Sequence, residues 1–237
     1  MATFSTFMDI LPDPSNKINS AGAADAAGSA GPGFAEVTFR SQNDGNQTSR
    51  TRSGRGVTAS PGSHTWMFDI KYNPLTRNEF DPVAAFLESR YGNRKPFYVI
   101  LPQHSAPKDA TFTGNTLTAS ATAAGSPSIM INGVSNGNPS VGDFFEISDS
   151  SDANHKKVYK VTRVETSTTY QTGTTAPTST QRRLWTQPPM NRAVSSGATI
   201  NFSNPKFRVI QSRDTFEYSL GTNNLYSYTL SLEEFLP

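Results

Sequence analysis

The chain has 237 residues, a net charge of +2 and no cysteine. The lack of cysteine excludes disulfides, thiolate catalysis and cysteine-ligated metal sites. The near-neutral charge gives no reason to expect binding of nucleic acid or an anionic membrane across the whole surface. Charged residues make up only 17% of the chain, whereas Ser, Thr and aromatic residues are frequent, with 15 Phe and 8 Tyr. This composition favours strands joined by turns and excludes a coiled coil.

Residues 1–33 predict a flexible N-terminal arm that ends in a linker. The linker is mostly Gly, Ala and Ser, which bury too little surface to offset their ordering entropy. Two interpretations remain open, a disordered arm or an arm that docks on a neighbouring subunit through Phe4, Phe7 and Met8. The arm lacks the basic start and apolar middle of a secretory signal, and no apolar run is long enough to span a membrane. We therefore expect synthesis in the cytosol.

The segment after the arm predicts two strands that flank an arginine-rich loop. Residues 34–40 and 64–72 alternate apolar with polar side chains, and the second of these is the clearest strand in the chain. Between them, Arg50, Arg52 and Arg55 form a local positive patch suited to phosphate or carboxylate groups. The loop is either a hairpin tip exposed to water or a charged loop that meets an acidic neighbour or faces a conduit for nucleic acid.

One helix is predicted directly after the second strand. Thr76 and Glu79 have the Thr-x-x-Glu spacing of a capping box, which places the helix start near Arg77. Proline is poorly tolerated deep inside a helix, so Asp81 is an alternative cap with Pro82 at the first helical position.

Two further strands complete the predicted sheet. Residues 95–102 are apolar on both faces, which is typical of a central strand. Residues 226–235 alternate cleanly near the end of the chain and need a partner. We expect that partner to be the early sheet, so that the chain ends meet around an inserted domain. We assign eight side chains to the core: Trp66, Phe68, Phe80, Leu87, Phe97, Val99, Tyr228 and Leu230.

Residues 104–205 are expected to form the inserted domain, with residues 34–103 and 206–237 building the larger domain around it. Short apolar runs separated by Gly, Asn and Ser clusters predict five or so short strands that close into a small barrel.

The catalytic inventory is thin, and it predicts no enzyme, no cofactor and no metal site. No nucleophile elbow, phosphate loop or dinucleotide fingerprint is present. The three histidines, His64, His104 and His155, are isolated, and the polar residues around His155 favour a solvated loop. One hydrolase hypothesis remains, because glycoside hydrolysis needs only two suitably spaced carboxylates. Its candidates are Asp143, Glu146, Asp149 and Asp152.

One series of motifs runs from Val37 to Pro102, and its most telling residues are Ser49–Arg55, Trp66, Pro74–Arg77, Phe80 and Phe97–Pro102. This segment resembles bacteriophage distal tail and baseplate hub proteins. A looser similarity covers the insertion and the closing strand, at Gly142–Phe144, His155–Thr162 and Tyr226–Phe235.

The resemblance implies a β-sandwich with one flanking α-helix and an inserted OB-like or galectin-like β-barrel. It also implies a homo-oligomeric ring, commonly hexameric, at the virion tail tip, made in the host bacterial cytoplasm. Its partners would be the tail tube protein, the baseplate hub and tail fibres, with DNA passing through the lumen without stable binding. A ring needs strand edges that pair between subunits, and residues 65–72 and 225–232 are the candidates.

A second hypothesis is a carbohydrate- or receptor-binding module on the virion surface. In that case the barrel would hold an oligosaccharide, with Trp185 or Tyr170 as the stacking platform. The two hypotheses are compatible, since the insertion faces outward on such rings.

Overall fold

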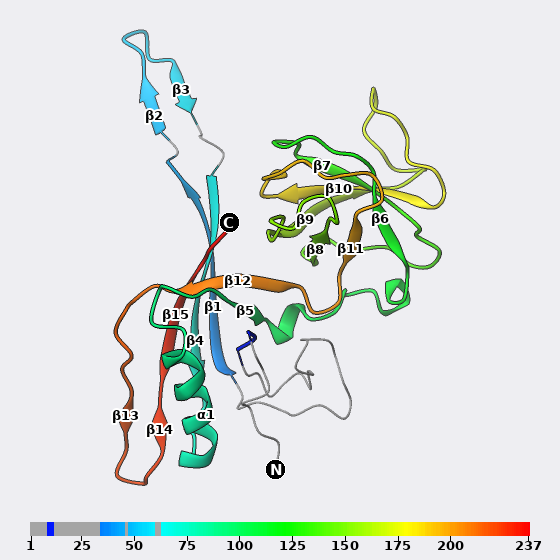
Figure 1. Ribbon diagram of the computed structural model, residues 1–237. Coiled ribbons are helices and arrows are strands. Elements are labelled where there is room, and N and C mark those ends of the chain that lie inside the picture. Colours follow the sequence, from blue (N-terminus) through cyan, green and yellow to red (C-terminus); the bar gives the residue numbers. More distant parts are fainter. Residues whose placement is uncertain (1–8, 12–33, 46, 60–62) are drawn as a thin grey trace.

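The computed structural model describes residues 9–11, 34–45, 47–59 and 63–237. The fold is mainly β, as the composition predicts: a β-sandwich with one flanking α-helix carries a small closed barrel (Figure 1). No helix in these ranges is long and apolar enough to cross a bilayer. The predicted interface residues Phe4, Phe7 and Met8 lie outside the described residues.

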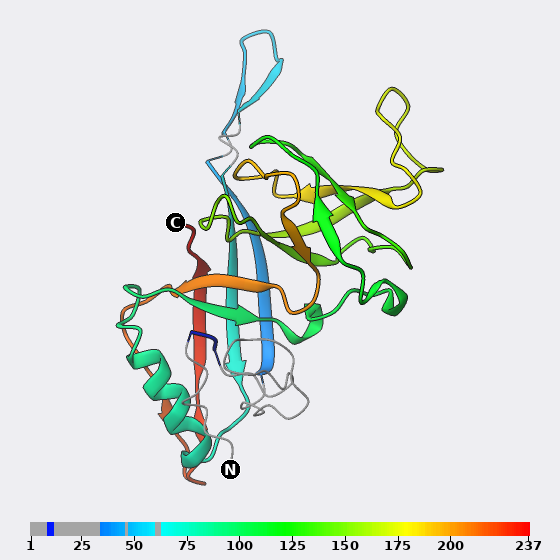
Figure 2. The ribbon, with the colours of Figure 1, turned by 45° about the vertical axis from the view of Figure 1, so that its right-hand side comes forward.

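The larger unit is a five-stranded antiparallel sheet in the order β1-β4-β15-β12-β5. Its strands are β1 (Phe34–Asp44), β4 (Ser63–Tyr72), β5 (Phe97–Ile100), β12 (Lys206–Gln211) and β15 (Thr229–Glu234). β12 and β5 cross over the other three strands, so the sheet folds back on itself as two layers (Figure 2). Leu232 pairs with Phe68 in register, which confirms that the closing strand shares a ladder with the early sheet.

Two expectations about the edges of this sheet are wrong. β4 and β15 are each paired on both sides, so neither offers a free edge to a neighbouring subunit. β5 is the last strand in the order instead of a central one. Its apolar outer face is explained by Ile10, which is buried against Ile100 and forms a parallel bridge with Tyr98. A short segment far away in the sequence therefore covers this edge.

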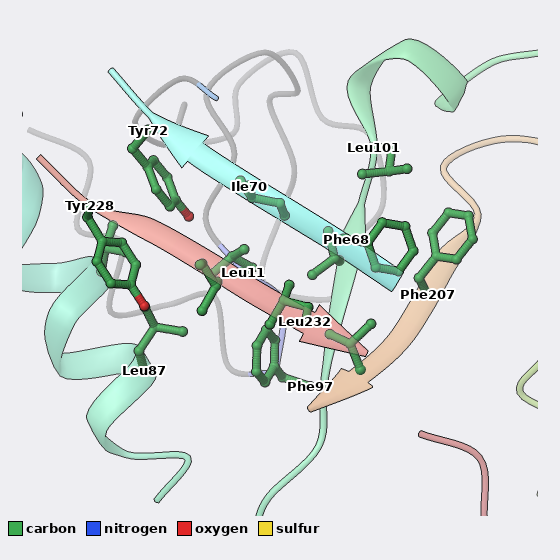
Figure 3. Close-up of a cluster of buried hydrophobic side chains, with 14 of the residues drawn as sticks. Leu11, Phe68, Ile70, Tyr72, Leu87, Phe97, Leu101, Phe207, Tyr228 and Leu232 are labelled. Carbon is green, nitrogen blue, oxygen red and sulfur yellow. The ribbon is translucent and has the colours of Figure 1, made fainter. Parts of the chain in front are cut away.

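The two layers enclose one large core. β4 alternates buried with more exposed side chains, and each of the eight predicted core residues is at most 6% exposed. Figure 3 shows side chains from both layers and from the helix meeting in this core. Residues labelled there include Phe68, Ile70, Leu87, Phe97, Phe207 and Leu232.

The helix α1 (Arg77–Glu88) begins where the capping box predicts. The Glu79 carboxylate accepts hydrogen bonds from the Thr76 backbone N–H at 2.9 Å and from its hydroxyl at 2.8 Å. Asp81 is therefore not the cap, and Pro82 lies inside the helix. The hydrogen bond that Pro82 cannot make would have used the carbonyl of Asn78, an exposed residue in the first turn.

The insertion is a closed barrel in the order β10-β7-β6-β11-β8-β9, six strands where five or so were expected. Its core is separate from that of the sandwich and includes Ile131, Phe145, Val161 and Leu184, all fully buried. The strands are β6 (Leu117–Ala119), β7 (Ser128–Asn132), β8 (Phe144–Ser148), β9 (Val158–Glu165), β10 (Gln181–Gln187) and β11 (Thr199–Asn201). Two 3₁₀ turns lead into it, η2 (Pro102–His104) and η3 (Ala110–Phe112).

Two hairpins extend from the sandwich in different directions. β2 (Gln47–Arg50) and β3 (Gly56–Ala59) project beyond the end of β1 and β4, at the top of Figure 1. β13 (Ser219–Leu220) and β14 (Tyr226–Ser227) lie at the opposite end beside α1, as Figures 1 and 2 both show.

Candidate assembly surface

The hairpin of β2 and β3, here called the arginine hairpin (residues 47–59), is shaped by its own turn. Arg50 pairs with Gly56, and Thr51 N–H donates to the Arg55 carbonyl at 2.9 Å. Gly54 has a φ of 81°, in the left-handed region that glycine adopts without strain. The Thr51 hydroxyl accepts a hydrogen bond from Arg55 N–H at 3.1 Å, which closes the turn. The local sequence therefore suffices to reverse the chain at this point.

All three predicted interface arginines of this loop lie at its tip. Arg50, Arg52 and Arg55 are exposed, and none forms an ion pair with a carboxylate in the described part of the chain. Every described side chain from Gln47 to Thr58 is exposed as well. The structure thus brings the three cations together on a projection, with no described surface of the same chain against it.

An isolated two-stranded hairpin is at best marginally stable in water. Among the described strands, β2 and β3 pair only with each other, so both outer edges of the arginine hairpin can accept another strand. Its guanidinium groups can bind carboxylates or phosphates in bidentate fashion. The chemistry available here is recognition of an acidic surface by an extended arm.

The joint between sandwich and barrel is a buried polar network that the sequence did not reveal. Lys157, directly before β9, forms an ion pair with Glu234 of β15, and each side chain is 1% exposed. The Lys157 ammonium also donates to the His64 carbonyl at 2.8 Å. Trp66 Nε1 donates to the Val158 carbonyl across the same joint at 2.8 Å. Burial raises the pKa of Glu234, and the neighbouring Lys157 opposes that rise.

This network fixes the barrel relative to the sandwich, because two charges buried together tolerate little displacement. No sequence signal marked the pair, since its members come from different domains and have no recognisable spacing.

The carboxylates of the hydrolase hypothesis each hold a loop in place. Asp143 accepts hydrogen bonds from the backbone N–H groups of Ser140 and Lys108, at 2.8 and 3.2 Å. Asp149 accepts from Ser195 N–H at 2.7 Å and Ser151 N–H at 2.8 Å, and these bonds lower its pKa. A general acid needs the opposite shift.

The other two hydrolase candidates are likewise engaged. Glu146 accepts from Asn201 Nδ2 and from Lys206 N–H, both at 3.0 Å, and Asp152 forms an ion pair with Arg192. The described residues also hold no cluster of three or more His, Asp or Glu side chains able to bind a metal ion.

The expectation that His155 lies in a solvated loop is wrong. His155 is 2% exposed, and its Nε2 atom lies 2.9 Å from the Tyr159 hydroxyl. That hydroxyl donates to Asn191 Oδ1 at 2.5 Å. Burial lowers the pKa of His155 and raises that of Tyr159. Tertiary packing, which the polar local sequence does not encode, buries this side chain.

The two aromatic candidates for sugar stacking differ in their availability. Trp185 is half-buried, its Nε1 donates to Glu165 at 3.0 Å, and the Arg163 guanidinium lies over its ring at 5.8 Å. Tyr170 is 43% exposed on the loop between β9 and β10. Among the described residues, no ring contact joins the two. Tyr170 is therefore the more exposed of the two, and Trp185 is held by contacts within the barrel.

A scan against protein-family models matched no family, and a search of curated proteins gave no match.

Proposed function

We propose that this protein is a structural component of a bacteriophage tail tip. It forms a ring, commonly hexameric in the proteins it resembles, that joins the tail tube to the baseplate hub and fibres and lets DNA pass. The observation that carries the proposal is the arginine hairpin, an exposed arm with three cations at its tip that contacts no described surface of its own chain. The family resemblance of Ser49–Arg55 and the following helix entry supports the same assignment.

The physical requirements of a ring agree with this proposal. A head-to-tail contact between identical subunits closes when its rotation divides the circle. An arm that leaves its own subunit can reach the next one, where carboxylates would neutralise its arginines and a strand edge would pair with its open ladder. The net charge of +2 suits a lumen through which DNA moves, because many phosphate contacts would slow its passage. No catalytic step and no cofactor is needed.

Native mass spectrometry and negative-stain imaging of the purified full chain at micromolar concentration test the proposal. We expect ring-shaped oligomers from the wild type and a shift to monomer in a variant with Arg50→Ser, Arg52→Ser and Arg55→Ser. A matched control removes three exposed cations elsewhere, by Arg77→Ser, Arg94→Ser and Lys95→Ser, and should still assemble. A wild-type protein that stays monomeric, also in the presence of tail tube protein, would count against the assignment.

A carbohydrate- or receptor-binding role of the barrel is the second candidate, favoured by one observation. Tyr170 is exposed on a loop that projects from the barrel (Figure 1), the arrangement in which an aromatic ring can stack on a sugar. A glycan array probed with the full chain and with Tyr170→Ala tests it. Binding that the variant loses would support the role, and an array without signal would argue against it.

A further inference from the structure

A groove lies between the sandwich and the barrel, beside strand β1. Its volume is about 590 Å³. Phe39 and Trp66 line it from the sheet, and Val141, Lys160 and Gln187 line it from the barrel. Val141 is 57% exposed although it is a large apolar side chain, so apolar surface remains open to solvent at the groove. Such surface commonly marks a binding site for another polypeptide.

The groove borders an open strand edge. β1 has 11 residues and, among the described strands, pairs only with β4. Its second row of backbone N–H and C=O groups can therefore take an added strand. Near one end of β1, Gln187 Nε2 donates to Asn43 Oδ1 at 3.0 Å and links the barrel to this strand. The site combines a backbone ladder, which requires an extended occupant, with an apolar hollow next to it.

The positively charged side chains around the groove indicate which kind of peptide would bind there. Lys160 lies over the Phe144 ring at 5.7 Å, and the Lys108 ammonium donates to the Val141 carbonyl at 2.7 Å. Neither forms an ion pair with a carboxylate of the described chain. Burial lowers the pKa of nearby His104, Lys160 and Lys108 lower it further, and Asp143 opposes them. An occupant with a carboxylate and apolar side chains fits these surroundings.

The chain itself contains an exposed segment that combines a carboxylate with apolar side chains. Glu217, Tyr218 and Leu220 are all exposed, the latter two at 50% and 54%, at the start of the hairpin of β13 and β14. β13 pairs only with β14 in the part of the chain described, so its outer edge is open. The Tyr218 ring packs against Phe80 of α1 in its own chain, with ring centroids 4.9 Å apart, so Leu220 is the exposed apolar side chain of β13 that remains available. Figures 1 and 2 show this hairpin at the end of the molecule away from the barrel and its groove, which excludes contact within one copy.

We propose that the groove beside β1 binds the Glu217–Leu220 segment of a second copy of this chain. β13 adds to the open edge of β1, Leu220 enters the apolar hollow, and Glu217 pairs with Lys160. The groove beside β1 and the Glu217–Leu220 segment lie on different parts of the molecule. The contact is therefore head-to-tail and repeats from copy to copy. The inference rests on the proposed ring and names a second contact between its subunits, beside that of the arginine hairpin.

Charge reversal tests this pairing in the full chain. Native mass spectrometry compares the wild type with Lys160→Glu, with Glu217→Lys and with the double variant. Each single reversal should weaken assembly on the order of tenfold, and the double variant should restore it, because the two charges meet again with exchanged signs. Lys71→Glu, an exposed lysine on β4 away from the groove, is the matched control and should assemble normally.

A second measurement does not depend on charge. Amide hydrogen exchange of β1 should slow when the wild type assembles, and the slowing should disappear in Leu220→Asp, whose altered side chain is exposed in the monomer. Wild-type rings that tolerate both charge reversals and leave β1 unprotected overturn the inference while the proposed function stands. Loss of assembly in the single variants without rescue in the double variant overturns the Lys160–Glu217 pairing. A wild type that stays monomeric overturns both proposals.

Discussion

The sheet pair of β1 with β4 and the arginine hairpin are neighbouring antiparallel pairs with opposite environments. In β4, every second side chain from His64 to Tyr72 is buried, whereas all four side chains of β2 are exposed. The sheet pair gains its stability from the core of its own subunit. No described side chain from Gln47 to Thr58 is buried, so under the proposed function a neighbouring subunit would supply the support that the core gives to the sheet pair.

The sequence difference behind this contrast is simple. β4 places Trp66, Phe68 and Ile70 at alternate positions, and their burial provides several kcal/mol of hydrophobic stabilisation. β2 reads Gln-Thr-Ser-Arg, and Val57 is the one large apolar side chain of β3. The predictions below probe the contrast, from the largest expected effect to the smallest.

Truncating a buried side chain of the sheet pair of β1 with β4 should cause the largest loss of stability. Trp66→Ala should lower the free energy of unfolding by about 5 kcal/mol, because it removes a fully buried indole and its hydrogen bond to Val158. Urea unfolding followed by circular dichroism measures the loss. Val57→Ala in the exposed arginine hairpin is the control and should change the free energy of unfolding by less than about 0.5 kcal/mol. Equal losses in the two variants would remove the contrast.

Breaking the buried ion pair should come next. Lys157→Met leaves the Glu234 carboxylate without its ammonium partner inside the joint and should cost about 3 kcal/mol. Adding Glu234→Leu replaces both charges by apolar groups and should recover much of the loss. The two variants are compared by thermal unfolding. A single variant as stable as the wild type would show that the joint does not depend on this pair.

Removing the helix cap should have a smaller effect. Thr76→Ala leaves the Glu79 carboxylate without its hydroxyl donor and should destabilise the protein by about 1 kcal/mol. Thr58→Ala, at an exposed position of the arginine hairpin, serves as the control with an expected change near zero. Calorimetry of both variants checks the difference, and no difference between them would contradict the role of the cap.

His155 in the barrel should make part of the protein's stability depend on pH. Burial lowers the pKa of His155 below its ordinary value of 6.5, so the unfolded state binds a proton more readily than the folded state. Stability that is present above pH 6.5 should therefore decline as the pH falls through 6. His155→Gln should flatten this slope. Unfolding free energies at pH 7.5 and 5.5 measure it, and an unchanged slope in the variant would exclude His155 as the cause.

The parts of the fold that sequence could predict are those encoded locally. The alternation of β4, the capping box at Thr76 and the glycine turn of the arginine hairpin each depend on neighbouring residues. The edge position of β5 escaped prediction because Ile10, far away in the chain, covers it. The ion pair of Lys157 and Glu234 and the groove beside β1 lie where two domains meet, so no pattern of neighbouring residues predicts them.

The central claim is that the arginine hairpin gains its partner when the protein assembles. Amide hydrogen exchange of residues 47–59, measured in assembled particles and in dilute protein, tests this directly. The account predicts fast exchange in dilute protein, strong protection in particles, and no protection when Arg50, Arg52 and Arg55 are all replaced by Ser. Particles in which these amides exchange as fast as in the dilute chain would contradict it.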